Sequence, residues 1–285
     1  MNFPRKDDPA FVMKEQYSFD ELLRLVAFLR NPEEGCPWDR VQTHESIQSS
    51  LIEEAWEAVN AIQNEGPDRL MDELGDVLMQ VVMHAQMAAE EGSFDIDDII
   101  ANLCRKLISR HSHLFGHDTA LTPEEVLKTW DRNKQKEKGL DSAAETLEEV
   151  PRGLPSLTRA YKIQKRAARY GFDWDNPEDP QAKITEEAEE LHSAFLTYGK
   201  ASPETEEEAG DLLFAVVNAL RHMGVDPEIA LGKASDKFTR RFSAVERELR
   251  SQNPDKEMED YTLEELDACW NRVKSKEKEE GHASR

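Results

Sequence analysis

Basic residues, cysteines and long apolar segments are all scarce in this 285-residue chain. Lys and Arg total 36 against 59 Asp and Glu, which gives a formal net charge of −23. So acidic a chain repels nucleic-acid backbones and anionic lipid headgroups, which excludes nucleic acid or a membrane as a partner bound through bulk charge. An anionic substrate such as a nucleotide would need a cation to bridge it to this surface.

The three cysteines, Cys36, Cys104 and Cys269, are far apart and form no Cys-x-x-Cys pair. This pattern predicts neither a disulfide framework nor a structural zinc site, as is typical of a reducing compartment. No apolar run approaches the ~20 residues that span a bilayer, and the first residues lack the apolar core of a secretory signal. We therefore expect a cytoplasmic protein without a membrane partner.

Apolar residues recur with helical spacing throughout the chain. Leu70, Leu74, Val77 and Leu78 follow one another at such intervals. Capping-box pairs, in which Ser or Thr precedes Glu by three residues, mark several expected helix starts. Short alternating runs of β-branched residues are absent, so the sequence predicts an all-α protein. The capping-box pairs are Ser18 with Glu21, Thr122 with Glu125, and Thr262 with Glu265.

An internal duplication divides the chain. Residues 121–138 and 261–278 share a Trp, an Arg and a closing Lys-x-Lys-Glu-Lys pattern. A second pair of matching segments reads GDVLMQVV and GDLLFAVV. So long a period indicates tandem duplicated domains rather than a solenoid. We expect a helical domain over residues 1–138, a linker rich in Gly and Pro over 139–157, and a second helical domain over 158–285.

Each copy carries the same two acidic motifs on consecutive expected helices. Glu-Glu-x-x-Glu is followed by Glu-x-x-Asp, and carboxylates three residues apart project from one helix face. A short connection favours antiparallel packing of the two helices, which would bring four carboxylates together in each copy. These are Glu54, Glu57, Glu73 and Asp76 in the first copy, and Glu187, Glu190, Glu208 and Asp211 in the second.

Four anions at close range are stabilised by a hard divalent cation, and an all-oxygen ligand set favours Mg²⁺ or Mn²⁺ over zinc. A di-iron centre is excluded because the positions that would carry the histidine of a Glu-x-x-His motif hold carboxylates instead, namely Glu57, Glu190, Asp76 and Asp211. In so acidic a chain the same runs can also be solvated helix faces. Their occurrence twice, beside apolar positions such as Leu74 and Leu213 that we expect in the core, favours the metal site.

Basic residues flank the acidic motifs of the second copy, and Phe238 and Phe242 interleave with those downstream. A basic helix face suits a polyphosphate, although the same cations can be solvated partners of glutamates. Phe172 and Trp174 can stack on a base or pack in a core. The basic residues are Lys183, one turn before Glu187, and the group Lys233, Lys237, Arg240 and Arg241.

Both acidic motifs, twice in one chain, together with the segments GCPWDRVQTHESI, KIQKRAARYGFDW and KASDKFTRRF, resemble the MazG-type nucleoside triphosphate pyrophosphohydrolases over nearly the whole sequence. The resemblance implies four-helix arrangements completed by dimerisation, and hence a homodimer. It also implies Mg²⁺-dependent hydrolysis of nucleoside triphosphates, NTP and dNTP alike, to the monophosphate and pyrophosphate. Such an activity controls or cleans the nucleotide pool.

The resemblance also assigns roles to individual residues. The C-terminal copy would be catalytic and the N-terminal cluster of Glu54, Glu57, Glu73 and Asp76 inactive or structural. Beyond the resemblance, we expect the attacking water to be activated by a metal ion or by a carboxylate such as Glu186 or Glu187. The implied metal ligands are Glu187, Glu190, Glu208 and Asp211. The implied nucleotide contacts are Lys183, Glu186, Glu187, Asp211, Lys237, Arg240, Arg241 and Trp270.

Two alternatives to broad triphosphate hydrolysis remain open from the sequence. The same fold can serve a narrower substrate, either a pyrimidine deoxynucleotide or a damaged nucleotide. In a different class, the chain can be a non-catalytic helical dimer that binds a nucleotide or a partner protein through its acidic surface.

Overall fold

The computed structural model describes residues 3–8, 11–120, 122–176 and 179–283, which leaves Leu121 of the first predicted repeat outside. Within these ranges the regular structure is helical and no strand is present, so the all-α prediction is confirmed. No described helix combines the length and apolarity needed to cross a bilayer. The helices are α1 Phe19–Leu29, η2 Asp39–Val41, α2 Gln48–Asn60, η3 Ala61–Glu65, α3 Pro67–Glu91, α4 Ile96–Arg110, α5 Ser112–Phe115, α6 Pro123–Lys138, α7 Ala143–Glu148, α8 Ser156–Ala168, α9 Asp179–Tyr198, α10 Pro203–His222, α11 Pro227–Gln252, η4 Met258–Asp260 and α12 Leu263–Ala283.

Local sequence signals explain where these helices begin. Ser18, Thr122 and Thr262 each accept a hydrogen bond from the backbone N–H three residues later, and the glutamate at that position bonds back to the cap. The three predicted capping boxes are therefore confirmed. Helices α3, α10 and α11 instead begin with proline, whose missing N–H has no partner to lose at the first helical position.

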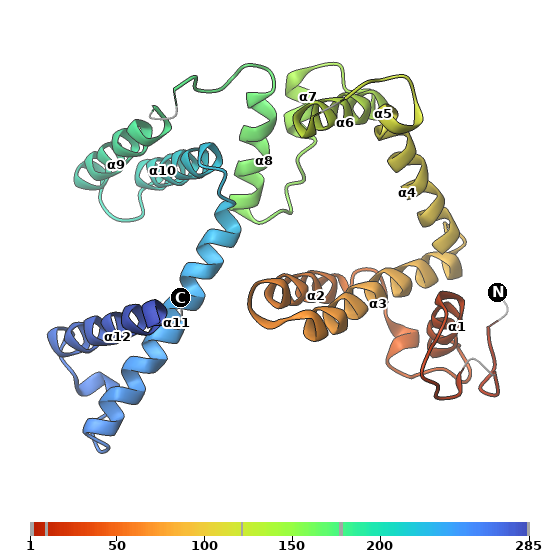
Figure 1. Ribbon diagram of the computed structural model, residues 1–285, viewed down its shortest axis with the longest axis horizontal. Helices are drawn as coiled ribbons and strands as arrows, with labels where there is room; N and C mark the ends of the chain where they lie inside the picture. The colour runs from red at the N-terminus through yellow and green to blue at the C-terminus, as the bar shows by residue number, and fades with distance from the viewer. Residues whose placement is uncertain (1–2, 9–10, 121, 177–178, 284–285) are drawn as a thin grey trace. The chain divides into compact units, whose positions relative to one another are not determined.

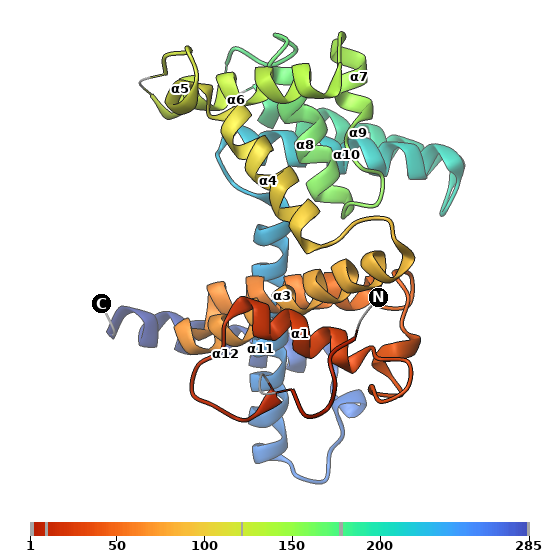
Figure 2. The same cartoon turned by 90° about the vertical axis from the view of Figure 1, so that its right-hand side faces the viewer.

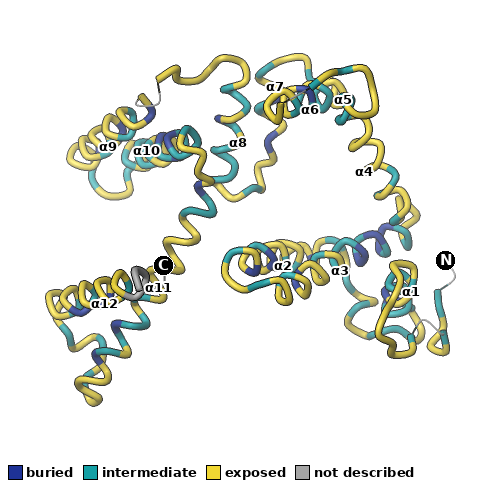
Figure 3. The backbone as a smooth tube through the Cα atoms, in the orientation of Figure 1, coloured by how far each residue is buried: buried dark blue, intermediate teal, exposed yellow. Residues whose placement is uncertain are grey.

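Contacts divide the chain into two compact units, Met1–Lys136 and Glu137–Arg285. The segment 139–157, predicted as a linker, contains α7 and the buried Val150 and lies within the second unit. In the first unit α2 lies beside α3, and α1 packs against α3 as well (Figure 1). Buried residues gather on the C-terminal half of α3 (Figure 3). The core around them consists of Val26, Ile47, Val82, Met83 and Met87.

The second unit is built around a helical hairpin. Helices α9 and α10 lie side by side and are joined by the short loop 199–202, so they run antiparallel as predicted (Figures 1 and 2). Helix α8 packs against α10, while α11 pairs with α12. The α11–α12 pair has its own small core, made of Val245, Leu249, Cys269 and Val273.

The structure corrects the expected burial of apolar residues beside the acidic motifs. Leu74 is 52% exposed and Leu213 is 59% exposed, so neither lies in a core of the single chain. The reason is that the helices packed against α3 and α10 within one chain cover only part of the surface of each. Helices α3 and α10 therefore present apolar side chains to the outside.

Candidate metal centre

Three acidic side chains of the second unit converge between α9 and α10. Glu187 and Glu190 extend from α9 and Glu208 from α10, and one carboxylate oxygen of each lies within 4.8 Å of the others. The i, i+3 spacing places the two α9 carboxylates on the face that meets α10. Glu187 is only 6% exposed. We call Glu187, Glu190 and Glu208 the second cluster.

Asp211 is the one predicted metal ligand of this copy that is not part of the second cluster. It lies one helical turn after Glu208 on α10 and lines a hollow together with Lys183 and Glu187. The two motifs therefore meet through Glu187, Glu190 and Glu208, while Asp211 lines the same hollow as Glu187.

Lys183 forms ion pairs with two carboxylates on the acidic face of α9. Its Nζ lies 2.8 Å from Oε1 of Glu186 and 2.7 Å from Oε1 of Glu187, so one ammonium group bridges both carboxylates. These hydrogen bonds, first to Glu186 and then to Glu187, raise the pKa of Lys183. The two ion pairs therefore favour the charged form of this lysine beside the cluster.

Glu190 has the opposite electrostatic situation, because its neighbours are other anions. Partial loss of solvent, followed by repulsion from Glu187 and Glu208, raises the pKa of Glu190. No ion pair of Glu190 or Glu208 is found among the described residues. The cluster therefore carries an excess of negative charge that a divalent cation would relieve.

A hollow of about 460 Å³ opens beside Glu187, within the size range of small-ligand sites. We call it the apolar hollow, because aromatic and aliphatic side chains form most of its wall. Lys183, Glu187 and Asp211 supply its charged edge. Its other lining residues include Phe172, Trp174, Phe214 and Asn218. Phe172 and Trp174, for which sequence left both a stacking and a core role open, are exposed at this hollow.

Several polar residues of the apolar hollow were not predicted from sequence. Asp173 pairs with Arg221 and lies 2.9 Å from Nε2 of His222, which ties the segment before α9 to the end of α10. Gln164 of α8 donates from Nε2 to the carbonyl of Phe214 at 2.8 Å, and its Oε1 is buried without a hydrogen-bond partner. These contacts appear only in the folded chain, since no spacing rule connects α8 or the segment before α9 with α10.

A second hollow, of about 530 Å³, lies on the other side of the cluster and is acidic. Glu190 and Glu208 line it, together with Glu186 and Glu189. Because Glu187 faces the apolar hollow and its two partners face the acidic one, the second cluster lies between the two hollows.

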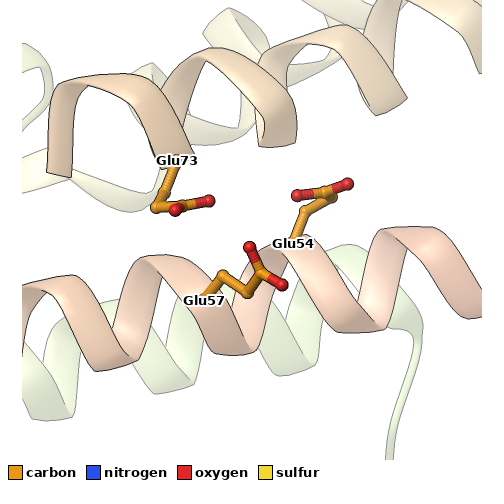
Figure 4. Close-up of side chains that lie close together, drawn as sticks. All are labelled: Glu54, Glu57 and Glu73. Atoms are coloured by element: carbon orange, nitrogen blue, oxygen red, sulfur yellow. The ribbon is translucent and has the colours of Figure 1, made fainter. Parts of the chain in front are cut away.

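The first unit repeats the convergence. Glu54 and Glu57 of α2 and Glu73 of α3 each place one carboxylate oxygen within 4.8 Å of the others, and Figure 4 shows the three side chains pointing into the gap between the helices. Asp76 is outside this set, as Asp211 is in the second unit. Burial, and then repulsion from Asp76, Glu57 and Glu73, raises the pKa of Glu54. We call Glu54, Glu57 and Glu73 the first cluster.

The basic group on α11 does not line either hollow. Arg240 and Arg241 bind Glu277 of α12, with Nε–Oε distances of 3.3 and 2.7 Å. The Arg241 guanidinium also lies 5.9 Å from the ring of Trp270, which packs against Phe238. Lys233 and Lys237 are exposed. Within one chain, the predicted nucleotide contacts thus separate into an α9–α10 set and an α11–α12 set.

The donor chemistry of both clusters fits a hard divalent ion. All ligand atoms are carboxylate oxygens, which Mg²⁺ and Mn²⁺ prefer over nitrogen or sulfur. Opposite oxygens of an octahedral Mg²⁺ site are about 4.2 Å apart, close to the 4.8 Å limit that encloses each cluster. In the first cluster, Oε2 of the buried Glu73 has no hydrogen-bond partner. Both sets are therefore capable of holding such an ion.

Family models identify this all-α chain, with its carboxylates gathered beside a hollow, as a helical nucleotide hydrolase by class. The MazG nucleotide pyrophosphohydrolase domain matches residues 42–115, and phosphoribosyl-ATP pyrophosphohydrolase matches residues 161–237. The two matches fall on the two copies, as the duplication predicts.

Two curated relatives extend the comparison to most of the chain. The nucleoside triphosphate pyrophosphohydrolase of Escherichia coli strain K12 is 44% identical over 258 residues, which covers 90% of this chain and 97% of that protein. The nucleoside triphosphate pyrophosphohydrolase/pyrophosphatase MazG of Thermotoga maritima is 44% identical over 256 residues, or 90% and 95% of the two chains. The chain therefore belongs to the MazG-type nucleoside triphosphate pyrophosphohydrolase family.

Proposed function

We propose that the α9–α10 site hydrolyses nucleoside triphosphates, ribo and deoxy, to the monophosphate and pyrophosphate, with Mg²⁺ as its ion and Mn²⁺ as a substitute. The observation that carries the proposal is the second cluster, where Glu187, Glu190 and Glu208 converge and Glu187 lines the apolar hollow. A polyphosphate and a nucleoside can thus be bound next to each other.

The ion would be held by Glu187, Glu190 and Glu208, with Asp211 as the predicted fourth ligand. When bound, Mg²⁺ offsets the charge of the triphosphate and lowers the pKa of a coordinated water. Such an ion is needed here because a tetra-anionic substrate would otherwise meet a surface of the same sign, in a chain of net charge −23.

The residues around the ion would accept a proton from the attacking water and position the carboxylates. Glu186 or Glu187 accepts the proton of the attacking water, whose oxygen bonds to a phosphorus at the α–β linkage while the bond to pyrophosphate breaks. Lys183 keeps both carboxylates in place. Among the described residues that line the apolar hollow there is no Ser, Thr, Cys or His, so no covalent enzyme intermediate is proposed there.

The apolar hollow is proposed to take the nucleoside. Phe172, Trp174 and Phe214 offer ring faces at its edge, and aromatic stacking tolerates every base because each base has a π face. This favours a broad substrate range over a single base. We place the reaction in the cytoplasm, where the three free thiols of Cys36, Cys104 and Cys269 would stay reduced.

We propose that the working form is a homodimer. Leu74 and Leu78 on α3, and Leu213 on α10, are exposed in the single chain although they lie on the helices that carry the clusters. A second copy that packs its own helix pair against these residues would bury them and complete a four-helix arrangement.

Pyrophosphate release from ATP with Mg²⁺ tests the proposal. We expect Glu190→Gln to lower kcat by about 10²-fold or more, because it removes one charged ligand of the ion. Glu57→Gln, the matching change in the first copy, is expected to retain most of the activity. Glu207→Gln removes the same charge next to Glu208 but outside the cluster, and is the matched control.

Three other results would contradict the proposal in different ways. Turnover abolished by Glu57→Gln alone would show that the first copy is the active one. Equal losses in Glu207→Gln and Glu190→Gln would show that the effect is general electrostatics. A parent protein that binds ATP and Mg²⁺ but releases no pyrophosphate would favour the non-catalytic binding alternative.

A further inference from the structure

We propose that Arg69 is an internal counter-ion that competes with divalent cations for the first cluster, so that this copy binds metal more weakly than the second. The inference rests on the proposed function in one respect, since it takes both clusters as metal-binding sets. It goes further by assigning the difference between the two copies to a single side chain.

Arg69 spans the gap between the two helices. Its Nη2 lies 2.5 Å from Oε1 of Glu73 on α3 and 3.9 Å from Oε2 of Glu57 on α2, and its Nε lies 3.4 Å from Oε2 of Glu65. Two of the three carboxylates of the first cluster, one from each helix, therefore share one guanidinium. This is the position that a bridging metal ion would otherwise take between the helices.

The first cluster has the character of a ligand site, not only of an acidic surface. Glu73 is 2% exposed, and its Oε2 is buried without any hydrogen-bond partner. In Figure 4 its carboxylate points across the gap toward Glu57. Arg69 occupies only one of its two oxygens, so Glu73 retains an unsatisfied acceptor directed into the cluster.

The second copy places its cation differently. Aligning the motifs matches Glu73 with Glu208, which puts Glu204 at the position of Arg69. Lys183 in turn matches Ser50 of the first copy. Lys183 contacts one member of the second cluster, Glu187, from the same helix, and its other partner Glu186 lies outside the cluster.

The expected consequence is a difference in metal affinity. An ion entering the first cluster has to displace the guanidinium from Glu57 and Glu73, or bind beside its positive charge. Arg69 is 53% exposed on its side chain, so screening reduces the repulsion but does not abolish it. We expect removal of the charge to tighten divalent binding at the first cluster about ten-fold or more.

Mn²⁺ binding to the full-length chain, followed by the loss of the free-ion signal in electron paramagnetic resonance, measures this directly. The variants carry Glu187→Gln and Glu190→Gln, so that the first cluster dominates the titration. In that background we expect Arg69→Met to lower the Kd for Mn²⁺ about ten-fold or more. Arg69→Lys, which keeps the charge, should change it much less. Arg105→Met removes an exposed arginine of α4 and is the charge control.

An unchanged Kd in Arg69→Met, or an equal change in Arg105→Met, would overturn the proposal. If Arg69→Met loses its helical circular dichroism signal, the Arg69→Lys variant decides instead. Because Arg69→Lys keeps the positive charge, a Kd for Mn²⁺ about ten-fold below that of the background protein would contradict the competition. Pyrophosphate release by the parent is measured separately. Its absence would count against the proposed function, whereas the Mn²⁺ comparison decides the role of Arg69.

Discussion

Glu73 and Glu187 show how a carboxylate is kept in a nearly dry position. Each has a cation one helical turn earlier on its own helix, Arg69 at 2.5 Å and Lys183 at 2.7 Å. An i, i+4 cation recovers part of the solvation that burial removes. Burial nevertheless raises the pKa of Glu73, while Arg69 opposes the shift. The two copies thus stabilise a buried carboxylate by the same i, i+4 ion pair, which lies on α3 in the first copy and on α9 in the second.

Glu248 illustrates a structural rather than a functional carboxylate. Its two oxygens accept from Lys276 at 2.8 Å and Arg272 at 2.9 Å, which ties α11 to α12. These hydrogen bonds, Lys276 first, lower the pKa of Glu248 to about 2. A folded-state pKa below that of the unfolded chain adds stability above about pH 4, and this stability is lost as the pH falls toward 2.

We therefore expect Glu248→Gln to lower the free energy of unfolding by about 1 kcal/mol at pH 7, since both basic partners are largely exposed. The difference from the parent should shrink between about pH 4 and pH 2. Urea denaturation at pH 7, 4 and 2.5 measures it, with Glu264→Gln on the exposed side of α12 as control. A deficit that stays constant across this range would show that the ion pairs are not its cause.

The hairpin of α9 and α10 depends on the tight loop between them. Gly199 has φ 84°, which glycine adopts freely, and Ala201 has φ 55°, which places a Cβ in the left-handed region. Hydrogen bonds fix this turn: Thr205 Oγ1 donates to the carbonyl of Gly199 at 3.0 Å, and Ser202 caps α10. The loop sets the register in which Glu208 faces α9.

Ala201 is strained at this position, by about 1 kcal/mol. We expect Ala201→Gly to be neutral or to raise the free energy of unfolding by up to about 1 kcal/mol, because part of the relief is offset by a more flexible unfolded chain. Ala201→Val should destabilise by more than about 1 kcal/mol. Chemical denaturation compares the three proteins. A clear loss of stability in Ala201→Gly would mean that the turn carries no strain.

The elements that sequence predicted well are those set by local rules. Capping boxes located helix starts, and the three-residue spacing brought Glu187 and Glu190 to one face. The sequence could not show that Asp211 lies outside the cluster, because that depends on the helix register. Nor could it show which partner the basic face of α11 meets: the spacing of Arg240 and Arg241 defines a face, but only packing places Glu277 against it.

At the scale of the whole molecule, the duplication has produced two units with the same helix pair and different electrostatics. Apolar periodicity identified the buried stripe of each helix but not which chain covers the rest. This is why Leu74 and Leu213 were assigned to a core and are exposed. The proposed dimer reconciles the apolar sequence pattern with the exposure seen in one chain, because the second copy would bury the residues that the sequence assigned to a core.

The dimer also offers a route by which the α11–α12 cations reach a nucleotide. In one chain Arg240 and Arg241 bind Glu277 and line neither hollow. If the partner supplies them, two inactive proteins should complement each other: Glu190→Gln, which lacks an intact cluster, and the double variant Arg240→Ala with Arg241→Ala, which lacks the cations. Random exchange of subunits makes about half of the dimers hybrid. Each hybrid has one intact site, in which the double variant supplies the cluster and the Glu190→Gln chain supplies the cations.

We therefore expect the mixture to recover about a quarter of the parental pyrophosphate release after subunit exchange, while each variant alone stays inactive. Light scattering on the same samples checks that the particles have the mass of two chains. A mixture of Glu190→Gln with Glu187→Gln has no intact cluster in any dimer and controls for non-specific rescue. Dimers that exchange subunits without regaining activity would place the cations and the cluster of each site in the same chain. In that case each site of a hybrid dimer would lack either its intact cluster or its cations.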